Sequence, residues 1–158
     1  MPKIARYILV SSALALASFG LLAQTASSLT VWKLNVSKSK FDGRGPLTMT
    51  RTVKTVGSVT TLSFEGIGPD GNRMSYSYET RFDDKDYPVS GAPPAGIETM
   101  AVKRVDAKTM QATGKKAGKI VLTATNVLSD DGKQLTATTK GTERDGRIST
   151  SVVVWDKQ

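Results

Sequence analysis

The chain has 158 residues and a formal net charge of +8, from 22 Lys and Arg residues against 14 Asp and Glu residues, and it contains no His and no Cys. This composition excludes a Ser-His-Asp triad, a thiol nucleophile, an ordinary zinc site and a lipid-bearing cysteine. Metal binding would rest on oxygen ligands, and catalysis on carboxylates, Lys, Tyr or Ser. No such constellation can be recognised, so we expect no enzyme, no metal site and no cofactor.

Residues 1–23 have the three-part layout of a secretory signal peptide. Lys3 and Arg6 form the basic start, and an apolar stretch then extends to Ala23. Cleavage is expected after Ala23, or alternatively after residue 26, which leaves residues 24–158 as one domain of roughly 130 residues. An uncleaved anchor would need about 20 apolar residues, and this segment is shorter and contains Ser. An exported chain without disulfides indicates a bacterial periplasmic or secreted protein, with no stable membrane insertion after cleavage.

The segments that follow are rich in Thr, Val, Ser and aromatic residues, which favour β-strands. In the clearest of them, apolar and polar residues alternate strictly from Arg73 to Phe82, which predicts one buried and one solvent-facing side. A shorter extended piece is predicted at Tyr87-Pro88-Val89. The ten predicted strands cover residues 30–36, 47–56, 58–66, 73–82, 87–89, 97–105, 109–115, 119–128, 134–142 and 147–156.

The strands are joined by short loops, several of which have almost the same sequence. These are Asp70-Gly71-Asn72, Asp131-Gly132-Lys133 and Asp145-Gly146-Arg147, with Asp83-Asp84-Lys85 as a relative that lacks Gly. Asp-Gly between alternating segments is a strong hairpin signal, because Gly accepts the positive φ that such turns need. An open meander of ten strands would leave exposed edges. The sequence therefore predicts an all-β, antiparallel up-and-down meander of about ten strands that closes into a barrel.

The two ends of the predicted barrel resemble the calycin superfamily. Val31-Trp32-Lys33-Leu34 opens the domain and Val154-Trp155-Asp156-Lys157 closes it. Both ends resemble those of the ten-stranded intracellular fatty-acid-binding proteins, and the early Trp is similar to that of the lipocalins. The chain is also similar to small exported bacterial proteins described as lipocalin-like, through Trp32-Lys33-Leu34-Asn35 and Asp86-Tyr87-Pro88-Val89. The resemblance implies a calycin-like β-barrel with a site for a small ligand in its interior.

Three features depart from the fatty-acid-binding pattern. Thr30 and Val31 stand where a Gly usually precedes the first Trp, and the loop 37–46 is too short for a two-helix lid. The Arg that binds a fatty-acid carboxylate in those proteins lies two residues before the last-strand aromatic, and here that position is Val153. The fold carries over from the resemblance, whereas the family's ligand does not.

A ligand inside such a barrel would contact apolar side chains together with a few polar groups. Tyr suits an amphipathic ligand, because its ring is apolar and its hydroxyl is polar. The alternative is that the same side chains fill the core, as they do in many small barrels. Strand 134–142 offers only small inward residues, either Ala137 and Thr139 or Thr136 and Thr138. The candidate ligand-binding residues are Leu62, Phe64, Met74, Tyr76, Tyr78, Phe82, Met100 and Val102.

The remaining charged residues give no specific site. The basic residues are spread over turns and strand faces, so we expect no nucleic-acid partner. Asp83, Asp84 and Asp86 lack the ligand spacing of a calcium loop, and Glu65 and Glu79 are expected to face outward rather than into a glycosidase cleft. The leading hypothesis is an exported binding protein for a small hydrophobic or amphipathic ligand. The alternative is a structural or interaction domain with a filled core, and the sequence leaves the oligomeric state open.

Overall fold

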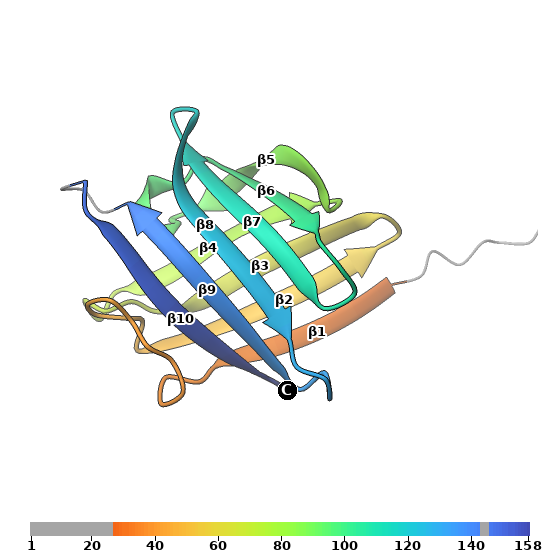
Figure 1. The fold of residues 1–158 in the computed structure, drawn as a ribbon, viewed down its shortest axis with the longest axis horizontal. Helices are drawn as coiled ribbons and strands as arrows, with labels where there is room; N and C mark the ends of the chain where they lie inside the picture. Colours follow the sequence, from red (N-terminus) through yellow and green to blue (C-terminus); the bar gives the residue numbers. More distant parts are fainter. Residues whose placement is uncertain (1–26, 143–145) are drawn as a thin grey trace, which may run out of the picture.

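A computed structural model describes residues 27–142 and 146–158 of the chain. Within them, ten antiparallel strands form one closed barrel, in which each strand pairs with the next and β1 pairs with β10 (Figure 1). This confirms the predicted all-β closed meander. The predicted signal peptide lies outside the described residues. The strands are β1 (Ser27–Leu34), β2 (Thr48–Val56), β3 (Val59–Ile67), β4 (Arg73–Thr80), β5 (Asp83–Gly91), β6 (Thr99–Arg104), β7 (Thr109–Lys116), β8 (Lys119–Leu128), β9 (Gln134–Thr142) and β10 (Ile148–Lys157).

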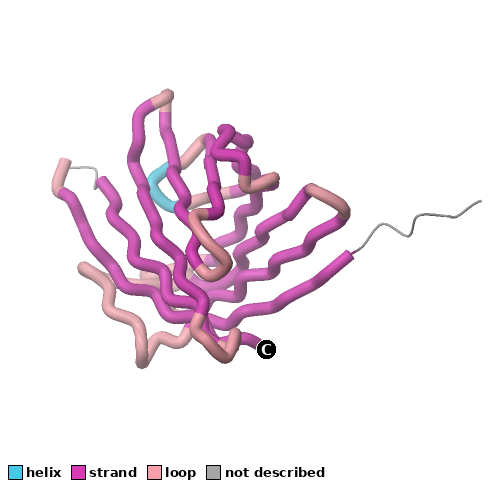
Figure 2. Tube along the Cα trace, turned by 45° about the vertical axis from the view of Figure 1, so that its right-hand side comes forward, coloured by secondary structure: helices cyan, strands magenta, loops and turns pink. Residues whose placement is uncertain are grey.

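Strands and short loops make up nearly all of the chain that the structure describes (Figure 2). The helical element among these residues is one short 3-10 turn, η1 (Pro94–Gly96), between β5 and β6. No described segment forms a helix with the length and apolar character needed to span a lipid bilayer.

The alternation predicted for β4 sets its orientation in the barrel wall. Tyr78 is buried, and Met74 and Tyr76 are half-buried against the core, whereas Arg73 and Glu79 are exposed. Successive side chains of a strand point to opposite faces, so the apolar set turns toward the lumen. The pairing of β4 with β3 places Tyr76 beside Phe64 and Tyr78 beside Leu62. The inner wall is therefore aromatic on this side of the barrel.

The Asp-Gly pairs form turns as predicted where the structure describes them. Gly71 and Gly132 have φ values of +83° and +68°. Asp70 accepts a hydrogen bond from the backbone N–H of Asn72, and Asp131 accepts one from that of Lys133, each at 3.0 Å. Hydrogen bonding lowers the pKa of both carboxyl groups, most through the side chain of Asn72 at Asp70 and that of Ser129 at Asp131. Both carboxylates therefore stabilise their own turns.

The prediction of a turn at Asp83-Asp84-Lys85 was wrong. These residues begin β5, and the chain reverses at Arg81 and Phe82 instead. Phe82 has a φ of +58°, and its N–H donates to the Thr80 hydroxyl at 3.0 Å. Asp84 also has a positive φ, of +61°, at the irregular start of the pairing between β5 and β6. Two non-glycine residues in the left-handed region make this tight connection, which residue types alone do not predict.

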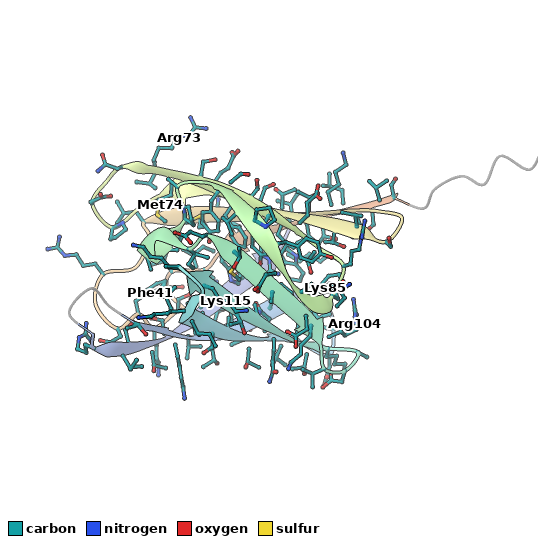
Figure 3. All side chains as sticks on the ribbon, turned by 90° about the horizontal axis from the view of Figure 1, so that it is seen from above. Phe41, Arg73, Met74, Lys85, Arg104 and Lys115 are labelled. Carbon is teal, nitrogen blue, oxygen red and sulfur yellow. The ribbon has the colours of Figure 1, made fainter. Side chains whose placement is uncertain are left out.

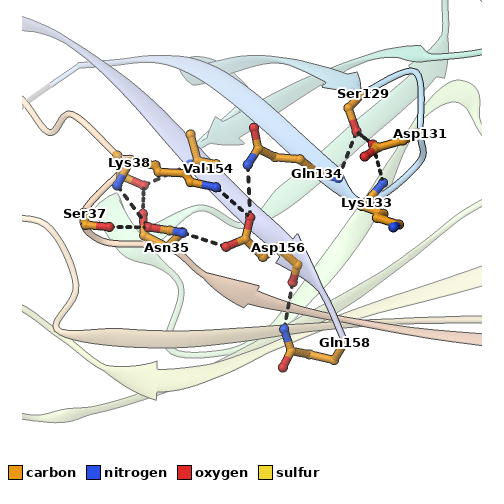
Figure 4. A network of polar contacts seen from close by, with 11 residues as sticks. Asn35, Ser37, Lys38, Ser129, Asp131, Lys133, Gln134, Val154, Asp156 and Gln158 are labelled. Atoms are coloured by element: carbon orange, nitrogen blue, oxygen red, sulfur yellow. Dashed lines mark hydrogen bonds and ion pairs between the residues drawn. The ribbon is translucent and has the colours of Figure 1, made fainter.

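The barrel closes through a short pairing of its first and last strands. Three register pairs join β1 to β10, among them Leu34 with Trp155. The loop after β1 continues the closure, because the backbone groups of Lys40 and Val152 exchange hydrogen bonds of 2.7 and 2.8 Å. A polar network ties this seam together (Figure 4). In it Asp156 accepts hydrogen bonds from Asn35 Nδ2 at 2.6 Å and from Gln134 Nε2 at 3.0 Å.

Asp156 makes the stability of this seam sensitive to acid. The hydrogen bonds from Asn35 and then Gln134 lower the pKa of its carboxyl group below the ordinary value of about 4. Its stabilising contribution is therefore complete above that ordinary value and is lost as the pH falls through the lowered one. We expect Asp156→Asn to be less stable than the wild type at pH 6, with a smaller difference at pH 3. Urea unfolding followed by Trp fluorescence measures both differences, and an equal difference at the two pH values would contradict the expectation.

Candidate functional site

The barrel encloses a cavity of about 410 Å³. The structure brings all eight predicted ligand-binding residues into its lining, although whether they contact a ligand stays a prediction. They are Leu62 and Phe64 on β3, Met74, Tyr76 and Tyr78 on β4, Phe82 in the following turn, and Met100 and Val102 on β6.

The cavity opens at one end of the barrel. Three residues of its lining are exposed, namely Arg44, Pro69 and Pro94. They come from the loop between β1 and β2, the turn between β3 and β4, and η1, which all lie at the same end of the meander. In Figure 3, Phe41 and Met74 lie toward this end, and Lys85 and Arg104 lie toward the other. The exposed lining residues therefore mark a mouth formed by these three loops.

Stacked rings form one side of the cavity. The Phe64 and Tyr76 rings are 4.6 Å apart and nearly parallel, with an interplanar angle of 9°. The Tyr78 ring lies 6.2 Å from Phe64 on a similar plane, and the edge of Trp155 approaches Phe64 at the same centroid distance. Offset stacking of this kind favours a fixed arrangement of rings. This wall is aromatic and apolar, with the hydroxyls of Tyr76 and Tyr78 as its polar groups.

Small side chains line the cavity on β7, β8 and β9. Ala112 pairs in register with Ala124, and Ala137 pairs with Asn126. On β9, Ala137 and Thr139 line the cavity, which decides between the two alternatives left open by the sequence. The expectation that this strand offers only small inward residues was wrong, because Leu135 lies on the same face and is buried in the core. Ala112, Ala124 and Ala137 therefore form a stretch of small side chains along the cavity, which elsewhere is lined by larger ones such as Met110 and Leu122.

The residue that sequence reasoning missed is Arg51 on β2. Its side chain is 7% exposed, and its Nη1 donates to Asn126 Oδ1 on β8 at 3.2 Å. The guanidinium carbon lies 5.7 Å from the centroid of the Phe64 ring. The signal was present in the sequence, because Arg51 alternates in phase with Met49 and Val53, the apolar residues of the same strand.

Among the residues that the structure describes, the charged residues of the lining are both positive, with Arg51 deep inside and Arg44 at the mouth. Burial raises the pKa of the Tyr76 and Tyr78 hydroxyls and lowers the pKa of the Arg51 guanidinium. The tyrosines are therefore neutral at physiological pH, while Arg51 remains charged because the ordinary pKa of Arg is above 12. No group of acidic residues able to hold a metal ion occurs in the part of the chain that the structure describes.

Comparisons with known proteins do not assign this cavity a function. No protein-family model matches the chain, and no curated protein or solved structure is significantly similar to it. The function has to be argued from the cavity itself.

Proposed function

We propose that the protein is an exported, lipocalin-like binding protein that holds a small hydrophobic or amphipathic molecule inside its barrel. The observation that carries this proposal is the cavity, since about 410 Å³ lies within the range of roughly 300–1,000 Å³ typical of small-molecule sites. A mainly apolar lining with a few polar groups is also typical of such sites. The signal-peptide pattern supports export, and the protein acts by binding rather than by catalysis.

Filling the cavity tests this proposal. Ala124 lines the cavity on β8, whereas its neighbour Thr123 is exposed. Ala124→Phe places a ring in the space that a ligand would occupy, and Thr123→Phe places the same ring outside the barrel. Phenylnaphthylamine, an uncharged probe whose fluorescence rises in apolar surroundings, reports binding by titration. We expect the wild type and Thr123→Phe to bind the probe, and Ala124→Phe to bind it about tenfold more weakly or not at all.

The stability of the same variants decides between a binding cavity and a filled core. An added ring in a tightly packed interior typically costs about 1–3 kcal/mol. In an empty cavity it displaces no protein atoms, so we expect Ala124→Phe to change the free energy of unfolding by less than about 1 kcal/mol. Failure of the wild type to bind the probe, together with strong destabilisation by Ala124→Phe, would favour a structural domain with a filled core. Native mass spectrometry of protein purified from its own host would show a retained ligand directly.

A further inference from the structure

The Arg51 guanidinium is a buried charge that hydrogen-bonds to the neutral Asn126 amide. Its Nε is buried, and within residues 27–142 and 146–158 it has no hydrogen-bond partner. No ion pair joins Arg51 to an acidic residue among the described ones. Buried charges in proteins are ordinarily paired, because removing them from water is costly. A negatively charged group bound next to Arg51 would therefore stabilise its buried charge.

In the described part of the cavity lining, hydrogen-bond donors accompany Arg51 and no acidic side chain does. Tyr76 and Tyr78 line the same cavity, and their hydroxyls make no hydrogen bond within the described residues. A neutral tyrosine hydroxyl can donate to an oxyanion, and a guanidinium presents several N–H donors in a planar fork. The arrangement is therefore suited to a group that accepts hydrogen bonds and carries negative charge.

We propose that the ligand is an amphipathic anion whose single acidic headgroup, a carboxylate or a phosphate, binds Arg51 inside the barrel while its apolar tail extends toward the mouth. This inference rests on the proposed binding function and specifies the class of ligand. Arg51 reaches the lumen from β2, whereas position 153 on β10, where the fatty-acid-binding proteins carry their Arg, is a valine here.

The depth of Arg51 sets the orientation of the ligand. Arg51 and Asn126 are both buried, whereas the exposed lining residues are at the mouth. The headgroup therefore enters first, and the tail lies against the apolar wall between Arg51 and the loops. Arg44 at the mouth adds a second positive charge, which attracts an approaching anion.

Two probes with the same tail test the inference. Dodecanoate and dodecanol differ in the charge of the headgroup, and each competes with phenylnaphthylamine for the cavity. At neutral pH we expect the wild type to bind dodecanoate about ten- to a hundredfold more tightly than dodecanol, the effect of hydrogen bonds to a charged group. Dodecyl phosphate serves as a third probe with the same tail. Whichever of dodecanoate and dodecyl phosphate binds with the lower Kd shows whether the site prefers a carboxylate or a phosphate.

Variants of Arg51 assign the preference to this side chain. In Arg51→Met, which keeps the length of the side chain without its charge, we expect the preference for the anion to disappear and dodecanol to bind at least as well as before. Arg51→Lys keeps the positive charge but loses the planar set of N–H donors of the guanidinium, so it should retain part of the preference for the anion over dodecanol. Arg73→Met, at an exposed arginine of β4, is the matched control and should bind as the wild type does.

The outcomes separate this inference from the proposed function. Binding of neither phenylnaphthylamine nor dodecanol by the wild type would overturn the binding function itself. Equal binding of dodecanol and both anions would overturn only the inference about charge, and would leave Arg51 as a structural residue held by Phe64 and Asn126. A preference that persists in Arg51→Met would show that another group binds the anion. If Arg51→Met does not fold, the wild type and Arg51→Lys still decide the question.

Discussion

Gly91→Ala is expected to lower the free energy of unfolding by roughly 3 kcal/mol, because two effects combine at this position. Gly91 has a φ of +92°, so any side chain is strained there. A Cβ at this position would also lie 2.4 Å from the Ser75 carbonyl oxygen and 2.9 Å from Tyr76 Cα. Both contacts are to the backbone of β4, so relief requires the strands to separate. Since β4 and β5 share three register pairs, including Tyr76 with Gly91, the substitution disrupts the only pairing between them.

Gly71→Ala separates the two effects. Gly71 has a similar φ of +83°, but a Cβ there would have no atom within 4 Å. We expect this variant to lose about 1 kcal/mol from backbone strain alone. Urea unfolding followed by the fluorescence of the two buried tryptophans, Trp32 and Trp155, measures both variants. Equal losses in the two would show that the contact with β4 does not matter.

Leu135→Ala is expected to destabilise the protein by about 3 kcal/mol, within the range for large-to-small changes in a core. Leu135 on β9 is 2% exposed and pairs in register with Trp155 on β10 and with Leu128 on β8. It belongs to the packed core and not to the cavity lining, so its removal leaves a void that its neighbours cannot fill. The loss should appear as a lower urea midpoint with an unchanged slope.

Leu29→Ala is the control for the same chemical change at the surface. Leu29 on β1 is 65% exposed, and we expect its truncation to alter the free energy of unfolding by less than about 0.5 kcal/mol. If Leu29→Ala and Leu135→Ala lowered the free energy of unfolding by similar amounts, Leu135 would not be packed in the core.

The strands could be predicted because their information is local. Alternation from Arg73 to Thr80 specifies both the strand and its inward face, and Gly71 and Gly132 specify the turns. The start of β5 could not be predicted, because the left-handed conformation that Phe82 adopts there is uncommon for a bulky residue and has no signal in the residue type. The predicted lining residues do surround one cavity, since a closed meander brings every inward face to the same lumen.

The cavity itself and its charge depend on pairings across the barrel. Ala112 and Ala124 could either leave space or pack against a ring from the opposite wall. The choice depends on how the strands are placed around the lumen, which the sequence does not show. Arg51 was missed because an arginine on a strand is ordinarily exposed. Its role becomes visible when barrel closure brings Asn126, 75 residues further along the chain, within hydrogen-bonding distance.

The closure of the barrel by its two ends has a kinetic consequence. Each hairpin joins neighbouring segments and can form early, whereas the contact between Asn35 and Asp156 spans 121 positions in the sequence. Contacts of such high sequence separation slow folding, because the entropy of closing a long loop must be overcome before they form. Until β10 pairs with β1, both strands remain open edges to which other chains can pair. Pairing of β10 with β1 therefore completes the ring and covers both edges at once.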